Sequence, residues 1–172
     1  TDHNLDCEGR DRTSMQFPQG QTELIRQVSA INGKTIVVLM HGAPIDLPWI
    51  DRVPAVLDMF FPGMEGGTAM ADILFGDADP SGRLTFSWPE RLEDSPVYEL
   101  ATQDVDNVNY EDSLMVGYRY FDTKRVTPRY EFGYGLSYTT FDYSKMKVKK
   151  DGDNCVVTLH VKNTGSRDGA EV

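Results

Sequence analysis

The run Thr35–Met40, with the sequence TIVVLM, constrains the fold of this chain more than any other feature. It is continuously apolar and rich in β-branched residues, a pattern typical of a strand buried on both faces of a parallel sheet. A second short strand is expected at Ala55–Phe60, and a loop returns the chain between the two. The sequence therefore predicts a parallel sheet inside an α/β domain.

Helices are expected on both sides of these strands. The first covers Gln19–Asn32, with Gly33 as its C-terminal cap and one apolar face made of Leu24, Ile25, Val28 and Ile31. The second covers Gly67–Phe75 and is closed by Gly76. The order helix, strand, loop, strand, helix predicts a doubly wound α/β layer. Because only two buried strands are present, we interpret the chain as the later part of an α/β sandwich, a mostly parallel sheet with flanking helices.

The pattern of apolar and polar residues changes after Asp77. We expect a strand at Arg83–Pro89, a long loop or wrapping arm at Glu90–Asn109, and packed aromatic segments at Tyr110–Tyr143. Lys145–Lys162 alternates apolar and polar residues around a turn at DGDN, which predicts a half-buried antiparallel hairpin. The residues 163–172 are expected to lead into a third strand. We thus expect two domains, an α/β unit with its arm at 1–140 and the first strands of a β-sandwich at 141–172.

Composition limits the partners and cofactors. The net charge is −10, from 27 acidic and 17 basic residues, which disfavours nucleic acid and anionic membranes but suits a neutral ligand such as a sugar. No apolar run is long enough to cross a bilayer. Cys7 and Cys155 do not form a CxxC pair and are expected to be free thiols. The three histidines lack metal-ligand spacing, so no metal and no other cofactor is expected.

A polar segment near the N-terminus offers a carboxyl group for chemistry. Glu8 precedes Gly9 and stands among Asp6, Arg10, Asp11 and Arg12 in a run without apolar periodicity, which indicates a loop. A glutamate in such a loop is compatible with a solvated surface charge or with a proton donor directed into a pocket.

Five blocks of the sequence, in order, resemble glycoside hydrolase family 3, the family of β-glucosidases and β-xylosidases. They match the family's EGxDR loop, its strand followed by G-x-P, its PGxEGG to PSG block, its paired aromatic GYRY and FGYGLSYT segments, and the start of its fibronectin type III-like domain. The blocks lie at residues 8–12, 35–51, 61–89, 116–144 and 161–172.

The resemblance implies an architecture and a mechanism. Family members combine a TIM-like barrel, an α/β sandwich and often a β-sandwich, so the barrel that carries the aspartate nucleophile would lie outside this chain. The acid/base glutamate of the EGxDR loop corresponds to Glu8. Arg10 departs from the family pattern, which often has an aromatic or small residue there. We expect Arg10 and Arg12 to pair with Asp6, Asp11 or a neighbouring domain, since pairing with Glu8 would lower its pKa.

The other motifs receive mainly structural interpretations. Gly63, Gly66 and Gly67 are expected to permit a tight turn into the second helix, and Glu65 to accept hydrogen bonds from its first amides. The aromatic residues between Tyr118 and Phe141 are expected to pack between domains, with sugar stacking as the alternative. His41 and Trp49, on loops after strands, are weak candidates for substrate binding, as is Arg10.

The resemblance favours an exo-acting β-glucosidase that cleaves a β-linked glucoside or oligosaccharide by a retaining mechanism, in a periplasmic or secreted location. The fragment alone is expected to be inactive without its barrel, and a homodimer is one option for its assembly. A β-xylosidase or another exo-β-glycosidase is the alternative within this class. A non-catalytic carbohydrate-binding or scaffold module is the alternative from another class, and it would need a pocket complete within this chain.

Overall fold

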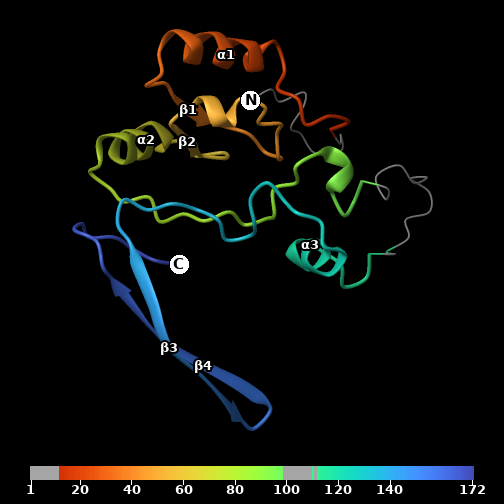
Figure 1. Cartoon of the computed structure of the whole chain (residues 1–172), viewed down its shortest axis with the longest axis vertical. Coiled ribbons are helices and arrows are strands. Elements are labelled where there is room, and N and C mark those ends of the chain that lie inside the picture. The colour runs from red at the N-terminus through yellow and green to blue at the C-terminus, as the bar shows by residue number, and fades with distance from the viewer. Residues whose placement is uncertain (1–11, 99–109, 111) are drawn as a thin grey trace.

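A computed structural model describes residues 12–98, 110 and 112–172 (Figure 1). Strands β1 (Ile36–Leu39) and β2 (Ala55–Asp58) form a parallel pair in which Ile36 lies opposite Ala55 and Leu39 opposite Asp58. Helices α1 (Gln21–Ile31) and α2 (Gly66–Phe75) flank them, and a short 3-10 helix, η1 (Ile50–Arg52), lies in the connection between the strands. The predicted α/β class is confirmed.

The core forms around the two strands and the segment that connects them. Trp88, from much later in the chain, joins this core and donates a hydrogen bond from its indole Nε1 to the carbonyl oxygen of Ile45 at 3.0 Å. The buried cluster consists of Met15, Val37, Leu39, Ile45, Leu47, Trp49 and Trp88. Burial of these large side chains is the main stabilising contribution in this part of the molecule.

The ends of the helices differ from the prediction. α1 ends at Ile31 and is capped by Asn32 rather than Gly33. The amide of Asn32 donates to the carbonyl oxygen of Val28, and its side-chain oxygen accepts from the amide of Lys34. Glu65 precedes α2 without bonding its amides, and its carboxylate accepts instead from the Thr68 hydroxyl at 3.3 Å. Gly76 does close α2 in the left-handed conformation, with φ of 82°.

The apolar face predicted for α1 is largely uncovered in this chain. Leu24, Val28 and Ile31 are 61%, 42% and 88% exposed, whereas Ile25 packs against the core. The face exists as predicted, but the described residues supply nothing large enough to cover it.

The segment predicted as a strand at Arg83–Pro89 is extended but forms no strand. It lies beside the segment 129–134, and Figure 1 shows the two running together below the sheet. Backbone hydrogen bonds join the two segments at both ends. The amide of Trp88 donates to the carbonyl oxygen of Tyr130 at 2.8 Å, and the amide of Leu84 donates to that of Tyr134 at 2.9 Å. Among the described residues, Trp88 and Tyr130 form an isolated bridge rather than part of a strand ladder.

Three short helices were not predicted, and the first, η1, lies in the segment expected to be a loop between the two strands. η2 covers Leu92–Asp94, within the segment expected to be a loop or arm, and α3 covers Tyr118–Lys124, within the aromatic region. The sequence of α3, YRYFDTK, lacks the apolar periodicity from which a helix is predicted. In the structure only Phe121 of this helix is buried. None of the helices in the described ranges is long and apolar enough to cross a membrane.

The predicted antiparallel hairpin is present. β3 (Phe141–Asp151) pairs with β4 (Asn154–Asn163), with a bulge between Ser144 and Lys147, and projects away from the rest of the molecule (Figure 1). The prediction that it is half-buried is wrong for this chain, since every residue of β4 is exposed. No third strand forms in residues 164–172.

Residues 164–172 instead turn back onto the α/β part. Arg167 donates to the carbonyl oxygen of Gly76, and Arg83 forms an ion pair with Glu171 at 2.9 Å. Asp79 strengthens this junction by accepting hydrogen bonds from the Ser137 hydroxyl and from the backbone amide of Tyr138. The hairpin therefore has a defined attachment although its strands are exposed.

Candidate active-site region

The segment that follows the predicted catalytic loop is anchored to the core. Glu8 and Arg10 lie outside the described residues, so their roles stay predictions. Arg12 donates from its guanidinium to the carbonyl oxygen of Gln16 at 3.0 Å. Met15 is 5% exposed within the core, and its carbonyl oxygen accepts from the amide of Asp46 at 2.8 Å. The chain that leaves Glu8 thus reaches a fixed position within seven residues.

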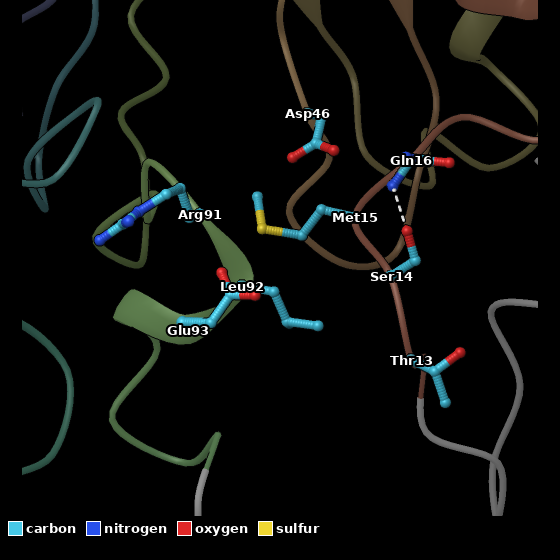
Figure 2. Close-up of a pocket in the computed structure, with 8 residues that line it drawn as sticks. All are labelled: Thr13, Ser14, Met15, Gln16, Asp46, Arg91, Leu92 and Glu93. Atoms are coloured by element: carbon cyan, nitrogen blue, oxygen red, sulfur yellow. Dashed lines mark hydrogen bonds between the residues drawn. The ribbon is translucent and has the colours of Figure 1, made fainter.

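A pocket opens beside this anchor (Figure 2). Its volume is about 270 Å³, and it is lined by residues 13–16 on one side, by Arg91, Leu92 and Glu93 on the other, and by Asp46 between them. Hydroxyl, amide, carboxylate and guanidinium groups all border it, together with the side chains of Met15 and Leu92. The lining is therefore mostly polar, which suits water or hydroxyl groups better than an apolar ligand.

Asp46 carries the unusual electrostatics of this pocket. Partial burial raises the pKa of its carboxyl group, the nearby charge of Arg12 acts in the opposite direction, and Glu93 and Glu90 raise the pKa further. Arg91 lines the same pocket but pairs with Asp94 at 2.8 Å, on the exposed side of η2. A carboxyl group with a raised pKa beside a pocket is a recognised sign of a functional region.

His41 lies where β1 ends, as its place in the sequence predicts. Its side chain is almost fully buried, with its ring 5.4 Å from that of Phe60 and 5.2 Å from that of Trp88. Its Nδ1 donates to the carbonyl oxygen of Ala43 at 2.8 Å, because a carbonyl oxygen can only accept. The ring therefore holds the turn that follows the strand.

The other ring nitrogen of His41 faces Asp58 at the end of β2. Nε2 lies 3.0 Å from Asp58 Oδ1, which also accepts from the amide of Phe60. The approach is too poorly directed to be a hydrogen bond, so Nε2 and Asp58 Oδ2 are buried without such a partner among the described residues. The pair nevertheless joins the carboxyl ends of both strands, the edge at which α/β sheets usually bind ligands.

Trp49, the other weak binding candidate, is 1% exposed and stacks on Phe17 with ring centroids 6.3 Å apart. In this chain the indole ring therefore lies inside the core. For His41 and Trp49 alike, the structure shows packing within the core, and substrate binding stays a prediction.

Sequence reasoning did not single out Asp46 or Asp58. Asp46 lies in the loop after one buried strand, and Asp58 ends the other. Neither position differs in local pattern from an ordinary surface aspartate. No group of three or more His, Cys, Asp or Glu side chains that could hold a metal occurs in the described ranges.

Comparison with known proteins places this region in a family. The profile described as "Glycosyl hydrolase family 3 C-terminal domain" matches residues 1–138. The chain belongs to this family. Its loop of Glu8, its strands β1 and β2 and its glycine-rich entry to α2 all fall within the matched range.

Individual family members agree over almost the whole chain. Thermostable beta-glucosidase B of Acetivibrio thermocellus is 44% identical over 171 residues, which cover 97% of this chain and 23% of that protein. Beta-glucosidase BoGH3A of Bacteroides ovatus is 40% identical over 99% of this chain and 24% of its own length. This family 3 chain thus spans about a quarter of the length of these relatives.

Solved structures confirm the fold of this family 3 chain. The crystal structure of the Bifidobacterium adolescentis GH3 beta-glucosidase aligns over 95% of the chain and 24% of its own, with a TM-score of 0.89 and 37% identity. That of the Kluyveromyces marxianus beta-glucosidase in complex with glucose aligns over 94% of this chain and 19% of its own, with a TM-score of 0.87 and 37% identity.

Proposed function

We propose that this chain is the part of a retaining β-glucosidase that supplies the catalytic acid/base, and that Glu8 is this residue. The observation that carries the proposal is the Glu-Gly loop of residues 8–9 inside a family 3 C-terminal domain, in a chain that matches about a quarter of two relatives named as beta-glucosidases. The nucleophile would then come from a barrel outside this chain.

The chemistry requires two carboxyl groups with different protonation states. In the first step the barrel carboxylate bonds to the anomeric carbon, the glycosidic bond breaks, and protonated Glu8 gives its proton to the leaving oxygen. In the second step ionised Glu8 takes a proton from water, whose oxygen displaces the carboxylate and releases glucose with the configuration retained. Glu8 must therefore start protonated, which nearby positive charge opposes.

The described residues support this role by anchoring the chain next to Glu8. Met15 enters the core, its carbonyl oxygen is bound by Asp46, and Arg12 folds back onto Gln16. A proton donor is effective only when it is held close to the leaving oxygen, and a fixed attachment of residues 12–16 suits that requirement. A periplasmic or secreted location and a homodimeric assembly stay predictions.

The test compares two glutamates that both lie in glycine-containing turns. In the intact enzyme, Glu8→Ala should slow glucosides with poor leaving groups by about 10²–10⁴-fold and those with activated phenols much less, because good leaving groups need no proton. Glu65→Ala is the control, since the Glu65 side chain is exposed and its carboxylate accepts only from Thr68 among the described residues. Leaving-group dependence in Glu65→Ala but not in Glu8→Ala would refute the assignment.

A further inference from the structure

The contact between His41 and Asp58 has no part in the proposed function. His41 follows β1 and Asp58 ends β2, and Nε2 of the imidazole lies 3.0 Å from Oδ1 of the carboxylate. We propose that these two residues form a pH-sensitive clamp. In this clamp a protonated imidazole holds the carboxyl ends of β1 and β2 together, and loss of the proton releases them. The clamp consists of described residues alone and is independent of the role of Glu8.

The hydrogen atoms of the imidazole follow from its contacts. Nδ1 lies 2.8 Å from the carbonyl oxygen of Ala43, which can only accept, so Nδ1 carries a hydrogen. In a neutral ring the other nitrogen, Nε2, would then present a lone pair to the carboxylate of Asp58. Two acceptor atoms 3.0 Å apart repel each other. An imidazolium and a carboxylate attract at the same distance, even where the N–H bond is not directed at the oxygen. The contact is therefore favourable only when the pair holds a second proton.

The surroundings of Asp58 favour the histidine as the site of this proton. Oδ1 accepts a hydrogen bond from the amide of Phe60 at 3.2 Å, which favours the ionised carboxylate. Oδ2 is buried without a hydrogen-bond partner among residues 12–98, 110 and 112–172, so a hydrogen on it would be an unpaired buried donor. A buried carboxylate with one oxygen in this state needs a positive charge beside it. His41 lies in the position to supply that charge.

The other groups packed against the imidazole suit a positive ring. The ring centroids of Phe60 and Trp88 lie 5.4 and 5.2 Å from that of His41, within the range in which an aromatic ring attracts a cation. These two rings and the carbonyl group of Ala43 carry no charge. Within the described ranges, Asp58 is the titratable group that these contacts bring to the imidazole. The two side chains are 3% and 19% exposed, so solvent screens their attraction only in part.

The clamp joins two loops that leave the same edge of the sheet. The turn after His41 leads to Asp46, whose amide donates to the carbonyl oxygen of Met15, and the chain after Asp58 leads into the glycine-rich turn before α2. An ordinary histidine of the unfolded chain is mostly protonated below about pH 6.5, so the stabilisation is fully present there. It is lost as the pH rises and the folded pair gives up its proton, because a lone pair then faces a buried carboxylate.

The charge of His41 is measurable by NMR in the intact enzyme with ¹⁵N-labelled histidine, since the shift of Nε2 separates a protonated nitrogen from one with a lone pair. The His41 signal is the one absent from His41→Gln, or, if that variant does not fold, the one in contact with the Trp88 ring. At about pH 7.5, where an ordinary histidine is mostly neutral, Nε2 should be protonated in the wild type. It should carry a lone pair in Asp58→Asn, because a side-chain amide can donate to it. A lone pair on Nε2 of the wild type would overturn the proposal.

Thermal unfolding of the intact enzyme between about pH 6 and 9 measures the effect of the clamp. Over this range the unfolding midpoint of the wild type should fall by roughly 2–4 °C more than that of Asp58→Asn, which has no ion pair to lose. His160→Gln is the matched control, since it replaces an exposed histidine of β4 and should leave the pH dependence of the wild type unchanged. The clamp is refuted if Asp58→Asn and the wild type depend equally on pH, or if His160→Gln removes the dependence as well.

Discussion

Two buried tryptophans of the core differ in one hydrogen bond. Trp88 Nε1 donates to the carbonyl oxygen of Ile45 at 3.0 Å, whereas Trp49 Nε1 is buried without a hydrogen-bond partner among the described residues. Both side chains are at most 2% exposed, so the cost of removing part of the indole ring is similar in the two positions. The hydrogen bond is therefore the main difference between them.

We predict that Trp88→Phe destabilises the protein more than Trp49→Phe does. Loss of the indole donor at position 88 leaves a buried carbonyl oxygen unsatisfied, which costs about 1–3 kcal/mol. At position 49 the same change removes a donor that has no partner among the described residues. Urea unfolding of both variants measures the difference, and equal losses of the free energy of unfolding would show that the bond to Ile45 contributes nothing.

At the scale of elements, the local patterns were predictable and the long-range ones were not. The apolar run at 35–40 predicts one strand and the alternation around DGDN predicts a hairpin of two, and all three strands are present with somewhat different ends. The segment 83–89 could not be assigned correctly, because whether it forms a strand depends on Tyr130 and Tyr134, more than 40 residues later.

In the candidate site, too, local motifs were predictable from the sequence and long-range contacts were not. The EGRDR motif identified Glu8 by resemblance, but no sequence pattern indicates that Asp46 meets Met15, since that contact depends on how the two segments pack. The capping role predicted for Glu65 was wrong, since its carboxylate accepts from the Thr68 hydroxyl and from none of the first amides of α2.

Two adjacent glycines at the start of α2 should respond in opposite ways to alanine. A Cβ atom on Gly66 would lie 2.7 Å from Cβ and Cγ of Pro62, whereas a Cβ atom on Gly67 would meet nothing within 4 Å. We predict that Gly66→Ala lowers the free energy of unfolding by about 1–3 kcal/mol. Gly67→Ala should raise it by roughly 0.5–1 kcal/mol, because alanine favours the helix.

Thermal or urea unfolding of the two variants side by side tests this prediction. Similar effects of both substitutions would show that the turn through Gly63 and Gly66 adjusts freely, and that its close packing against Pro62 does not constrain the entry to the helix.

At the scale of the whole molecule, the described chain exposes more apolar surface than an isolated globular domain usually does. One surface is the outer face of α1, with Leu24, Val28 and Ile31, and another is the hairpin, with Tyr143, Met146, Val148, Val157 and Leu159 exposed by between 42% and 71%. Among residues 12–98, 110 and 112–172, no further strand pairs with either edge of the hairpin. Exposed apolar surfaces of this kind are expected of a chain that spans about a quarter of the length of its relatives.

We predict that the 172-residue chain, prepared alone, associates in solution and unfolds with low cooperativity. Sedimentation velocity over a range of concentrations, together with calorimetry, measures both properties. The same preparation should not hydrolyse aryl β-glucosides, because the proposed nucleophile lies outside it. A monomer that melts in one sharp transition would contradict this view of the exposed surfaces.

Chemical rescue of Glu8→Ala tests the central claim most directly. In the intact enzyme with an activated aryl β-glucoside, the variant should accumulate the glycosyl-enzyme, because no base remains to activate water. Azide needs no base, so adding it should restore turnover and give β-glucosyl azide, identified by its anomeric NMR signal. Restored turnover with the β-azide product is the predicted result. An unchanged rate without any glucosyl azide, or an α-azide product, would contradict the assignment of Glu8 as the acid/base of a retaining enzyme.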